Sequence, residues 1–443
     1  MDKFTKKMNY WQYIRHLLPS IMTAIFVSFY TVIDGFFVVR SSGGELALAG
    51  INIVLPITSL TFGSAVMLAT GVSAIIGKKM GEGKNNEVNG IFSFISLVLL
   101  LIGAFFTVIG LVFIEDISIL LGASETLMPY VIPYCFTIFA GFIPMSFKLF
   151  FEYLVRTDGN PRVAMVMSGS GVLLNILFDY LFVIVFEMGT LGAGLGTTVS
   201  VVISGLIGLV YFLFFSHIRF SAPKFDLKIL LKSMANGSSE MLTELSSGIV
   251  TLVFNLVIFK YYGENGIAAI TIIIYIYYFF LAFYQGISVG SAPYISYNYG
   301  AKNPKKIREI FKYSTITIMV TTVIVLILSY GFSGPIIDIF ANTQEVKDLT
   351  VEGLNYFALL FIFVGFNVFM SSYFTALGDG LSSAIISTLR SLIFILLYTF
   401  ILEIPFGAIG VWLSMPCSEL STLIVTIILF TIKGKKYLKN SVN

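Results

Sequence analysis

Twelve long apolar runs dominate the sequence, and each is long enough to cross about 30 Å of hydrocarbon as a helix. They cover, approximately, residues 13–39, 50–76, 90–114, 129–156, 161–187, 191–217, 233–260, 267–296, 310–334, 350–377, 382–405 and 409–432. With 57% hydrophobic and only 12% charged residues, the chain has too much apolar surface for a water-soluble core. The sequence therefore predicts an all-α integral membrane protein with twelve transmembrane helices.

The basic residues predict how these helices are oriented. If the N-terminus is cytoplasmic, the inner segments hold 22 of the 27 Lys and Arg residues, the outer loops hold three, and two lie within spans. Cytoplasmic loops of membrane proteins carry such an excess of positive charge. We therefore expect a multi-pass protein of the cell (cytoplasmic) membrane with both termini in the cytoplasm.

The two halves of the chain repeat each other. Glycine-flanked segments of the first half recur in the second at a nearly constant spacing: Gly71–Gly81 matches Gly290–Gly300, and Gly189–Ser200 matches Gly407–Ser418. Because each half has six spans, both halves enter the membrane from the same side, and the repeats are parallel. We expect two parallel six-helix bundles around a central cleft, an N-terminal lobe of residues 1–220 and a C-terminal lobe of residues 221–443.

Two carboxylates within the N-terminal half are the most informative polar residues. Asp34 lies in the first span and Asp179 in the fifth, and each follows a polar residue, Tyr30 or Asn175, by four positions, which is one helical turn. At 1.5 Å per residue, Asp34, Asp179 and Thr197 of the sixth span lie about 9, 12 and 10 Å below the outer surface. These three residues thus share one level of the membrane.

This shared level predicts a cation site. Two carboxylates close together in a low dielectric cannot both stay ionised, so one binds a proton unless a cation neutralises the pair. Alternatively, Asp34, Asn175 and Asp179 form an oxygen cage for a small hard cation such as Na⁺. The competing interpretation is that each aspartate is satisfied separately by a neighbouring hydroxyl or backbone group.

The C-terminal half offers a second set of charges inside the membrane. Glu240 and Glu244 lie on the seventh span, Arg390 on the eleventh and Glu419 on the twelfth. A buried arginine with a glutamate partner is most simply a structural clamp, which is our interpretation of Arg390 and Glu419. Glu244, near mid-membrane, is a candidate for a cationic substrate or a second coupling ion.

Other polar and aromatic residues have weaker interpretations. Lys148 and Glu152 are four residues apart on the fourth span and predict an internal ion pair. The eighth span is rich in rings, and Tyr278 and Gln285 on it are candidates for contact with a flat lipophilic cation. The alternative is that these rings face lipid.

Pro19 lies fifteen residues before Asp34, within the first span. A proline inside a helix removes one backbone hydrogen bond and favours a kink. We expect the first helix to bend there when Asp34 changes protonation. The alternatives are that Pro19 merely begins the helix, and that access alternates by rocking of the two halves.

Together these residues resemble the multidrug and toxic compound extrusion (MATE) family of secondary transporters. The resemblance spans nearly the whole chain and rests on the two six-span halves and on the spacing of Pro19 and Asp34. It also rests on two motifs: Arg156-Thr-Asp-Gly159-Asn-Pro161 followed by Asn175-x-x-x-Asp179, and Gly189-x-x-Gly-Ala-x-Leu-x-Thr197.

The resemblance implies a function and roles for particular residues. Members export organic cations in exchange for H⁺ or Na⁺. It implies that a glutamate matching Glu244 takes part in coupling in some members, and that the proline matching Pro19 lets the first helix bend. It also implies that five residues form the protonation or Na⁺ site: Tyr30, Asp34, Asn175, Asp179 and Thr197.

Two departures from the family pattern bear on coupling. Many members have Asn where this chain has Glu152, which adds a charge to the N-terminal lobe and makes Glu152 a further candidate for a second coupling or substrate site. The intramembrane aspartate on the tenth helix of some Na⁺-coupled members has no counterpart, because residues 354–377 contain no acid. A Na⁺ site of that kind in the C-terminal lobe is therefore not expected.

Other classes of protein fit less well. Flippases of lipid-linked saccharides share this architecture, but they favour a more cationic cavity; they remain the alternative function. The sequence has no catalytic motif and no nucleotide-binding loop, so we expect neither an enzyme nor ATP-driven transport. We expect small-molecule organic cations and the lipid bilayer as partners, no nucleic acid, no cofactor besides the coupling ion, and a monomer.

Overall fold

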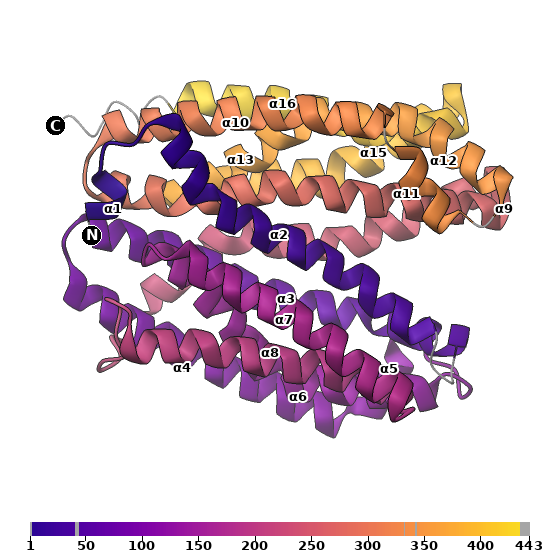
Figure 1. The fold of residues 1–443 in the computed structure, drawn as a ribbon, viewed down its shortest axis with the longest axis horizontal. Coiled ribbons are helices and arrows are strands. Elements are labelled where there is room, and N and C mark those ends of the chain that lie inside the picture. The colour runs from indigo at the N-terminus through magenta and orange to yellow at the C-terminus, as the bar shows by residue number, and fades with distance from the viewer. Residues whose placement is uncertain (1, 40–43, 332, 342, 435–443) are drawn as a thin grey trace.

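The structure, a computed structural model, describes residues 2–39, 44–331, 333–341 and 343–434, and these are nearly all helical (Figure 1). The elements are α1 (Asp2–Thr5), α2 (Tyr10–Val39), α3 (Gly44–Gly81), α4 (Asn85–Val112), α5 (Ile114–Leu120), α6 (Met128–Thr157), α7 (Pro161–Asp179), η1 (Tyr180–Val185), α8 (Gly189–Phe214), α9 (Leu227–Gly300), α10 (Pro304–Gly331), α11 (Ser333–Phe340), α12 (Gln344–Phe357), η2 (Ala358–Leu360), α13 (Phe361–Leu377), α14 (Gly380–Thr388), η3 (Leu389–Ile393), α15 (Phe394–Phe406), α16 (Ala408–Leu429) and η4 (Phe430–Gly434). Segments η1, η3 and η4 are π-helical, and η2 is a single 3₁₀ turn.

Twelve helical spans follow one another in the predicted order. Over the described residues, ten helices are long and apolar enough to cross a membrane. One of them, α9, has 74 residues and breaks at Gly263, whose φ of 56° and ψ of −142° are not helical, so it supplies two spans. The 30-residue α2 supplies one more. The predicted all-α architecture is therefore confirmed.

The internal repeat is visible in where the helices begin. Four helices of the first half and four of the second start at positions related by one and the same shift along the chain: Asn85 and Pro304, Ile114 and Ser333, Pro161 and Gly380, Gly189 and Ala408. The second of these pairs begins the short helices α5 and α11, which the sequence analysis did not predict. The two halves therefore have the same succession of elements.

Residues at the helix ends explain why the chain turns where it does. Pro161 and Pro304 begin α7 and α10, a position at which the missing N–H costs nothing. The Asp379 side chain caps α14 by accepting a hydrogen bond from the backbone N–H of Ser382 (3.2 Å). Just before it, Gly378 ends α13 in a left-handed conformation with a φ of 82°.

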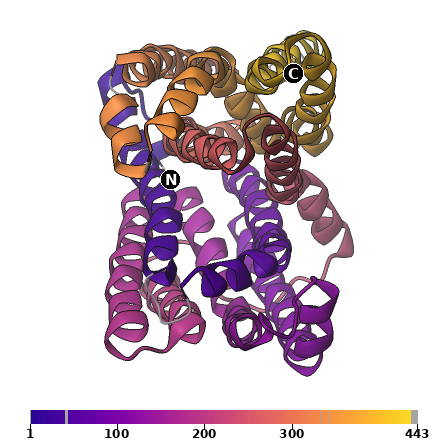
Figure 2. The ribbon, with the colours of Figure 1, turned by 90° about the vertical axis from the view of Figure 1, so that its right-hand side faces the viewer.

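The helices form two bundles that lie side by side (Figures 1 and 2). Helices α3 to α8 make one bundle and α9 to α16 the other, and the non-helical connection between Phe214 and Leu227 joins them. The predicted boundary between residues 220 and 221 lies in this connection. Helix α1 and the end of η4 lie at the same end of the molecule, here called the α1 end; α5 and α11 lie at the other end, the α5 end.

Glycines bring the two bundles into backbone contact at the α1 end. A Cβ added at Gly81 of α3 would lie 2.0 Å from the carbonyl oxygen of Tyr297, and one at Gly300 of α9 would lie 1.9 Å from that of Lys78. The repeat that matches Gly81 with Gly300 also matches Lys78 with Tyr297, so it relates the two contacts to each other. Ten residues earlier on α3, a Cβ at Gly71 would lie 1.9 Å from the carbonyl oxygen of Ser233.

Helix α2 contacts both bundles. Near its start, the Tyr13 hydroxyl forms a 2.6 Å hydrogen bond with the Ser314 hydroxyl of α10. Further along, a Cβ at Gly286 of α9 would lie 2.4 Å from Cα of Ile21, so the two backbones nearly touch. Beyond that point α2 packs on α7, where a Cβ at Gly169 would lie 3.3 Å from the Phe26 ring. The Phe29 ring still packs against Phe279 of α9, with ring centroids 5.6 Å apart, so α2 lies between the two bundles there.

Candidate functional site

The predicted site residues of the fifth span lie deep in the N-terminal bundle. Asn175 and Asp179 are one turn apart on α7, and both are completely buried. The Asn175 amide has no hydrogen-bond partner within the described part of the chain. A buried polar group without a partner costs about 1–3 kcal/mol, so such a group in a folded protein calls for an explanation.

The backbone around Asp179 is adapted to the carboxylate. Helix α7 ends at Asp179, and the π-helical segment Tyr180–Val185 follows directly; short π segments often occur at functional sites. On α8, a Cβ at Gly196 would lie only 2.2 Å from the Asp179 Oδ1. The absence of a side chain at Gly196 therefore lets the carboxylate pack directly against α8.

Of the residues predicted to lie near Asp179, the structure describes only some side chains. Thr197 follows Gly196 on α8 and is half-buried. Tyr30 and Asp34 belong to α2, but their side chains lie outside the described residues. Gly169 of α7 packs against Phe26 of α2. Position 34 lies eight residues beyond Phe26, which is about 12 Å along α2, and Asp179 lies ten residues beyond Gly169, which is about 15 Å along α7. Pairing of the two aspartates stays a prediction.

No three of the residues His, Cys, Asp and Glu gather as a metal site in the portion that the structure describes. The predicted Na⁺ site of Asp34, Asn175 and Asp179 includes a side chain outside that portion. The structure describes two of its oxygen ligands, the Asn175 side-chain carbonyl and the Asp179 carboxylate. Na⁺ prefers oxygen ligands of this type.

Pro19 lies inside α2 rather than at its beginning, since the helix starts nine residues earlier at Tyr10. The Thr23 hydroxyl donates a hydrogen bond to the Pro19 carbonyl (2.9 Å), and this pattern favours bending of a helix. Pro19 is next to the part of α2 that contacts α9, and before the part that contacts α7. A change of bend there would move one part of α2 relative to the other.

The fourth span carries a buried ionic group on α6. The Glu152 carboxylate lies 2.5 Å from Lys148 Nζ and 2.8 Å from Arg156 Nη2. Arg156 Nη1 donates to the Glu152 backbone oxygen (2.9 Å). The predicted ion pair of Lys148 and Glu152 is present, and Arg156 extends it; because both carboxylate oxygens face cations, the geometry favours a structural role for Glu152.

A second buried ion pair lies in the C-terminal bundle. Arg390 Nη1 is 3.3 Å from Glu419 Oε1, and Glu419 is only 1% exposed. The Asn367 amide donates to Glu419 Oε2 and to its backbone oxygen, both at 2.8 Å. Helices α13 and α16 and the π segment η3 meet at this pair, an arrangement suited to the predicted clamp.

The acids of the seventh span face the boundary between the bundles. Glu244 is half-buried, and a Cβ at Gly63 of α3 would lie 3.4 Å from its Cβ. Tyr278 is 41% exposed and lies within the electrostatic range of Glu244, and Gln285 is exposed seven residues further along. The ring of Tyr277, in contrast, packs inside the bundle against Phe357.

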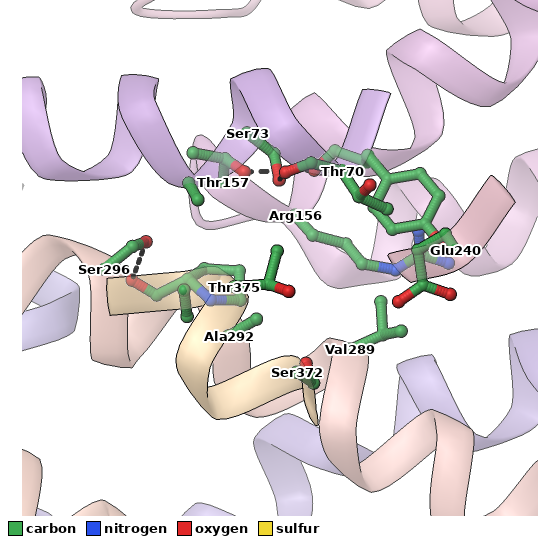
Figure 3. A pocket seen from close by; sticks show the side chains of 14 residues that line it. Thr70, Ser73, Arg156, Thr157, Glu240, Val289, Ala292, Ser296, Ser372 and Thr375 are labelled. Carbon is green, nitrogen blue, oxygen red and sulfur yellow. Dashed lines mark hydrogen bonds between the residues drawn. The ribbon is translucent and has the colours of Figure 1, made fainter. Parts of the chain in front are cut away.

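A small pocket lies between the bundles (Figure 3). Residues from α3, α6, α9 and α13 line it: Thr70, Ser73, Ala74, Tyr153, Arg156, Thr157, Glu240, Val289, Ala292, Pro293, Ser296, Ser372, Thr375 and Ala376. Sequence reasoning noted Glu240 but gave it no role, and it did not predict the pocket. Hydroxyl residues at helical spacing, such as Thr70 and Ser73, were the available signal.

Comparison with known proteins identifies the class. The MatE family model matches residues 19–181 and 240–415, which is more than half of the chain. The chain belongs to this family of membrane transporters, whose members are not enzymes, and the predicted resemblance is confirmed.

Particular relatives have similar lengths. The chain is similar to the multidrug export protein MepA of Staphylococcus saprophyticus, with 23% identity covering 94% of this chain and 93% of that protein. MepA of Staphylococcus aureus strain MSSA476 gives the same values. Among solved structures, an outward-facing multidrug resistance MATE family transporter of the MOP superfamily has a TM-score of 0.91 and 21% identity, over 96% of both chains.

Proposed function

We propose that the chain is an antiporter that uses an H⁺ or Na⁺ gradient to export lipophilic organic cations across the cytoplasmic membrane. The observation that carries this proposal is the buried pair Asn175 and Asp179, set beside a π-helical segment and against Gly196. A carboxylate removed from water binds a proton or a small cation much more readily than one in solution. The MepA proteins to which the chain is similar are named multidrug export proteins, and these names agree with the proposed function.

The groups at the bundle boundary suit cationic cargo. Glu240 and Glu244 bring two carboxylates to that boundary, and Tyr278 adds a partly exposed ring. Carboxylates attract cations, and an aromatic face adds about 0.5–2 kcal/mol through cation–π contact. Arg390, a buried arginine of the C-terminal bundle, is paired with Glu419, whose carboxylate balances its charge.

Coupling would proceed through α2. When Asp34 and Asp179 bind a proton or Na⁺, their local charge falls and a less hydrated environment becomes preferable. Helix α2 contacts the C-terminal bundle on both sides of Pro19 and the N-terminal bundle beyond it, so a bend at Pro19 would change how the two bundles lie relative to each other. A difference of a few kcal/mol between two arrangements is enough to shift their populations.

The α1 end would face the cytoplasm, because the loops at that end carry most of the Lys and Arg residues. In that orientation, the glycine contacts between α3 and α9 close the cytoplasmic side. The bilayer surrounds the twelve spans, the protein works as a monomer, and no cofactor besides the coupling ion takes part.

Transport by purified protein in liposomes tests the proposal. A fluorescent organic cation is the cargo, and an imposed pH gradient is compared with an imposed Na⁺ gradient. We expect Asp34→Asn and Asp179→Asn each to abolish gradient-driven transport, and the double variant to be no worse than either. Asp116→Asn, which changes an exposed acid on α5, is the matched control.

Near wild-type transport by both single variants, folded in the membrane, would refute the proposed coupling site.

Competition with matched cationic and anionic dyes tests which class of cargo the protein transports. A preference for anions or polyprenyl phosphates would instead favour a flippase of lipid-linked saccharides.

A further inference from the structure

The short helix α1 packs on the C-terminal bundle, although it precedes the first span of the N-terminal half. The Phe4 side chain is only 3% exposed. Its ring stacks on that of Tyr297 and makes an edge contact with Tyr294, with ring centroids 5.0 Å apart in both cases. The Phe4 backbone oxygen accepts a hydrogen bond from the Asn298 amide at 3.0 Å. A helix of four residues is not stable by itself, so these contacts with the end of α9 hold it in place.

The contacts with the C-terminal bundle continue into the start of α2. The Met8 backbone oxygen accepts a hydrogen bond from the Tyr313 hydroxyl of α10 at 3.4 Å. The ring of Tyr10 packs edge-on against the ring of Tyr313, with centroids 5.6 Å apart. The Tyr13 hydroxyl is bonded to Ser314 one residue further along α10. The chain from Phe4 to Tyr13 is therefore attached to α9 and α10.

The internal repeat shows the same arrangement in the other half. The non-helical connection that precedes α9 is attached to α4 of the N-terminal bundle. In it, the backbone N–H of Ser221 donates to the Ser93 hydroxyl at 2.8 Å, and the Phe225 ring packs against Phe94 with centroids 5.5 Å apart. The repeat that relates α4 to α10 also matches Phe94 with Tyr313. Each half is thus preceded by a segment that is fixed to the other half at a corresponding place.

Beyond these contacts, the interface between α2 and α9 is smooth. A Cβ at Gly290 would lie 2.9 Å from the Leu17 side chain and 3.1 Å from the Ser20 hydroxyl oxygen. Ser20 is 2% exposed, and its hydroxyl has no hydrogen-bond partner in the described part of the chain. Packed helices can slide past each other when few directional bonds fix their register. The hydrogen bonds and stacked rings at α1 and the start of α2 supply that direction.

We propose that α1 is an anchor that holds the beginning of α2 on the C-terminal bundle, with Phe4 as a positioning residue for transport. When the N-terminal bundle moves, the anchored part of α2 stays with α9 and α10, and the rest of α2 takes up the motion. The consequence for transport rests on the proposed function. The anchoring itself can be measured without cargo or an ion gradient.

A buried thiol at position 20 measures how often α2 leaves α9. Ser20→Cys loses no described hydrogen bond, and the residue lies about 15 Å along α2 from its start at Tyr10, well away from Phe4. The label is a water-soluble thiol reagent, and the purified chain has its own cysteines, Cys135 and Cys417, replaced by Ala. The opening of a local segment depends on the contacts that hold it, so the labelling rate reports the strength of the anchor.

Phe4→Ala should raise this labelling rate about tenfold, which corresponds to about 1.4 kcal/mol. Phe4→Leu keeps an apolar side chain at the buried position and should restore most of the protection. Trp11→Ala, which removes an aromatic side chain that is 76% exposed, is the matched control and should change nothing. A wild-type labelling rate in Phe4→Ala would overturn the proposal, because α1 would then stabilise only its own surroundings.

Transport in liposomes separates positioning from cargo binding. Phe4→Ala should lower the maximal rate and leave the KM for a fluorescent organic cation unchanged, because α1 lies away from the acids at the bundle boundary. Tyr294→Leu removes the ring on the α9 side and should have the same effect, and it replaces Phe4→Ala if that variant does not fold. The double variant should be no worse than Phe4→Ala, because both substitutions break one contact.

A raised KM at an unchanged maximal rate, or additive effects of the two substitutions, would contradict the anchor. The two proposals fail in different ways. If the wild-type chain transports no cation but Phe4→Ala still exposes the thiol, the proposed function is wrong and the anchor stands. If the wild-type chain transports the cation and Phe4→Ala changes neither labelling nor the maximal rate, the anchor alone is wrong.

Discussion

The glycine contacts at the α1 end predict how closure of the bundles can be weakened. In Gly81→Ala, the new methyl group would lie 2.0 Å from the Tyr297 carbonyl oxygen, and in Gly300→Ala it would lie 1.9 Å from that of Lys78. An ordinary contact begins near 3.4 Å, so the backbones must separate by about 1.4 Å. Overpacking of this kind costs about 1–3 kcal/mol.

That cost applies only while the bundles are closed. A difference of about 1–3 kcal/mol changes the ratio of closed to open arrangements by about 5- to 150-fold. Because the repeat relates the two contacts, we expect both substitutions to act in the same direction and by similar amounts.

Labelling of a buried thiol measures this ratio. Ser296→Cys places a thiol at a position that is 1% exposed in the pocket, in a background where Cys135 and Cys417 are replaced by Ala. We expect Gly81→Ala and Gly300→Ala to raise the rate at which a water-soluble reagent labels this thiol. Gly248→Ala, a helix glycine with nothing within 4 Å of the added methyl, is the matched control. Labelling at the wild-type rate in both variants would refute the steric argument.

Three further predictions concern other parts of the molecule. Gly196→Ala puts a methyl group 2.2 Å from the Asp179 carboxylate, so we expect at least a tenfold loss of gradient-driven transport while the protein stays folded; wild-type transport would contradict this. Arg390→Met leaves Glu419 buried without its partner and should cost about 3–5 kcal/mol in unfolding free energy, whereas adding Glu419→Leu should restore much of it. Denaturant or thermal unfolding in detergent compares the two. Pro19→Ala should leave cargo binding nearly intact and slow export strongly, and unchanged export at equal expression would favour rocking of the bundles over bending of α2.

Much of the fold follows from the sequence because its causes are local. A run of apolar residues long enough for the bilayer predicts a span wherever it occurs, and all twelve spans were found in order. The internal repeat, recognised from glycines such as Gly81 and Gly300, reappears in the starts of the helices. The short helices α5 and α11 were missed because they are too short to give a periodic signal.

The candidate site was predictable only in part. A charged residue inside an apolar run is noticeable by itself, so Asp179, Glu244 and Arg390 could be selected from the sequence. The pairing of Arg390 with Glu419, which lie on different spans, was a hypothesis that the structure supports with a distance of 3.3 Å. The ion pair of Lys148 with Glu152 was easier to predict from the sequence, because residues four apart are neighbours on any helix.

The sequence by itself determined the number of spans, the parallel repeat and the residues that are costly in a membrane, because hydrophobicity and helical spacing are properties of single segments. Only the tertiary structure decided which backbones touch and which side chains line the pocket between the bundles. The fit of Gly196 against Asp179, and the pocket that Glu240 lines, depend on how separate helices pack. Packing depends on contacts between distant segments, and the spacing of residues along one segment does not encode it.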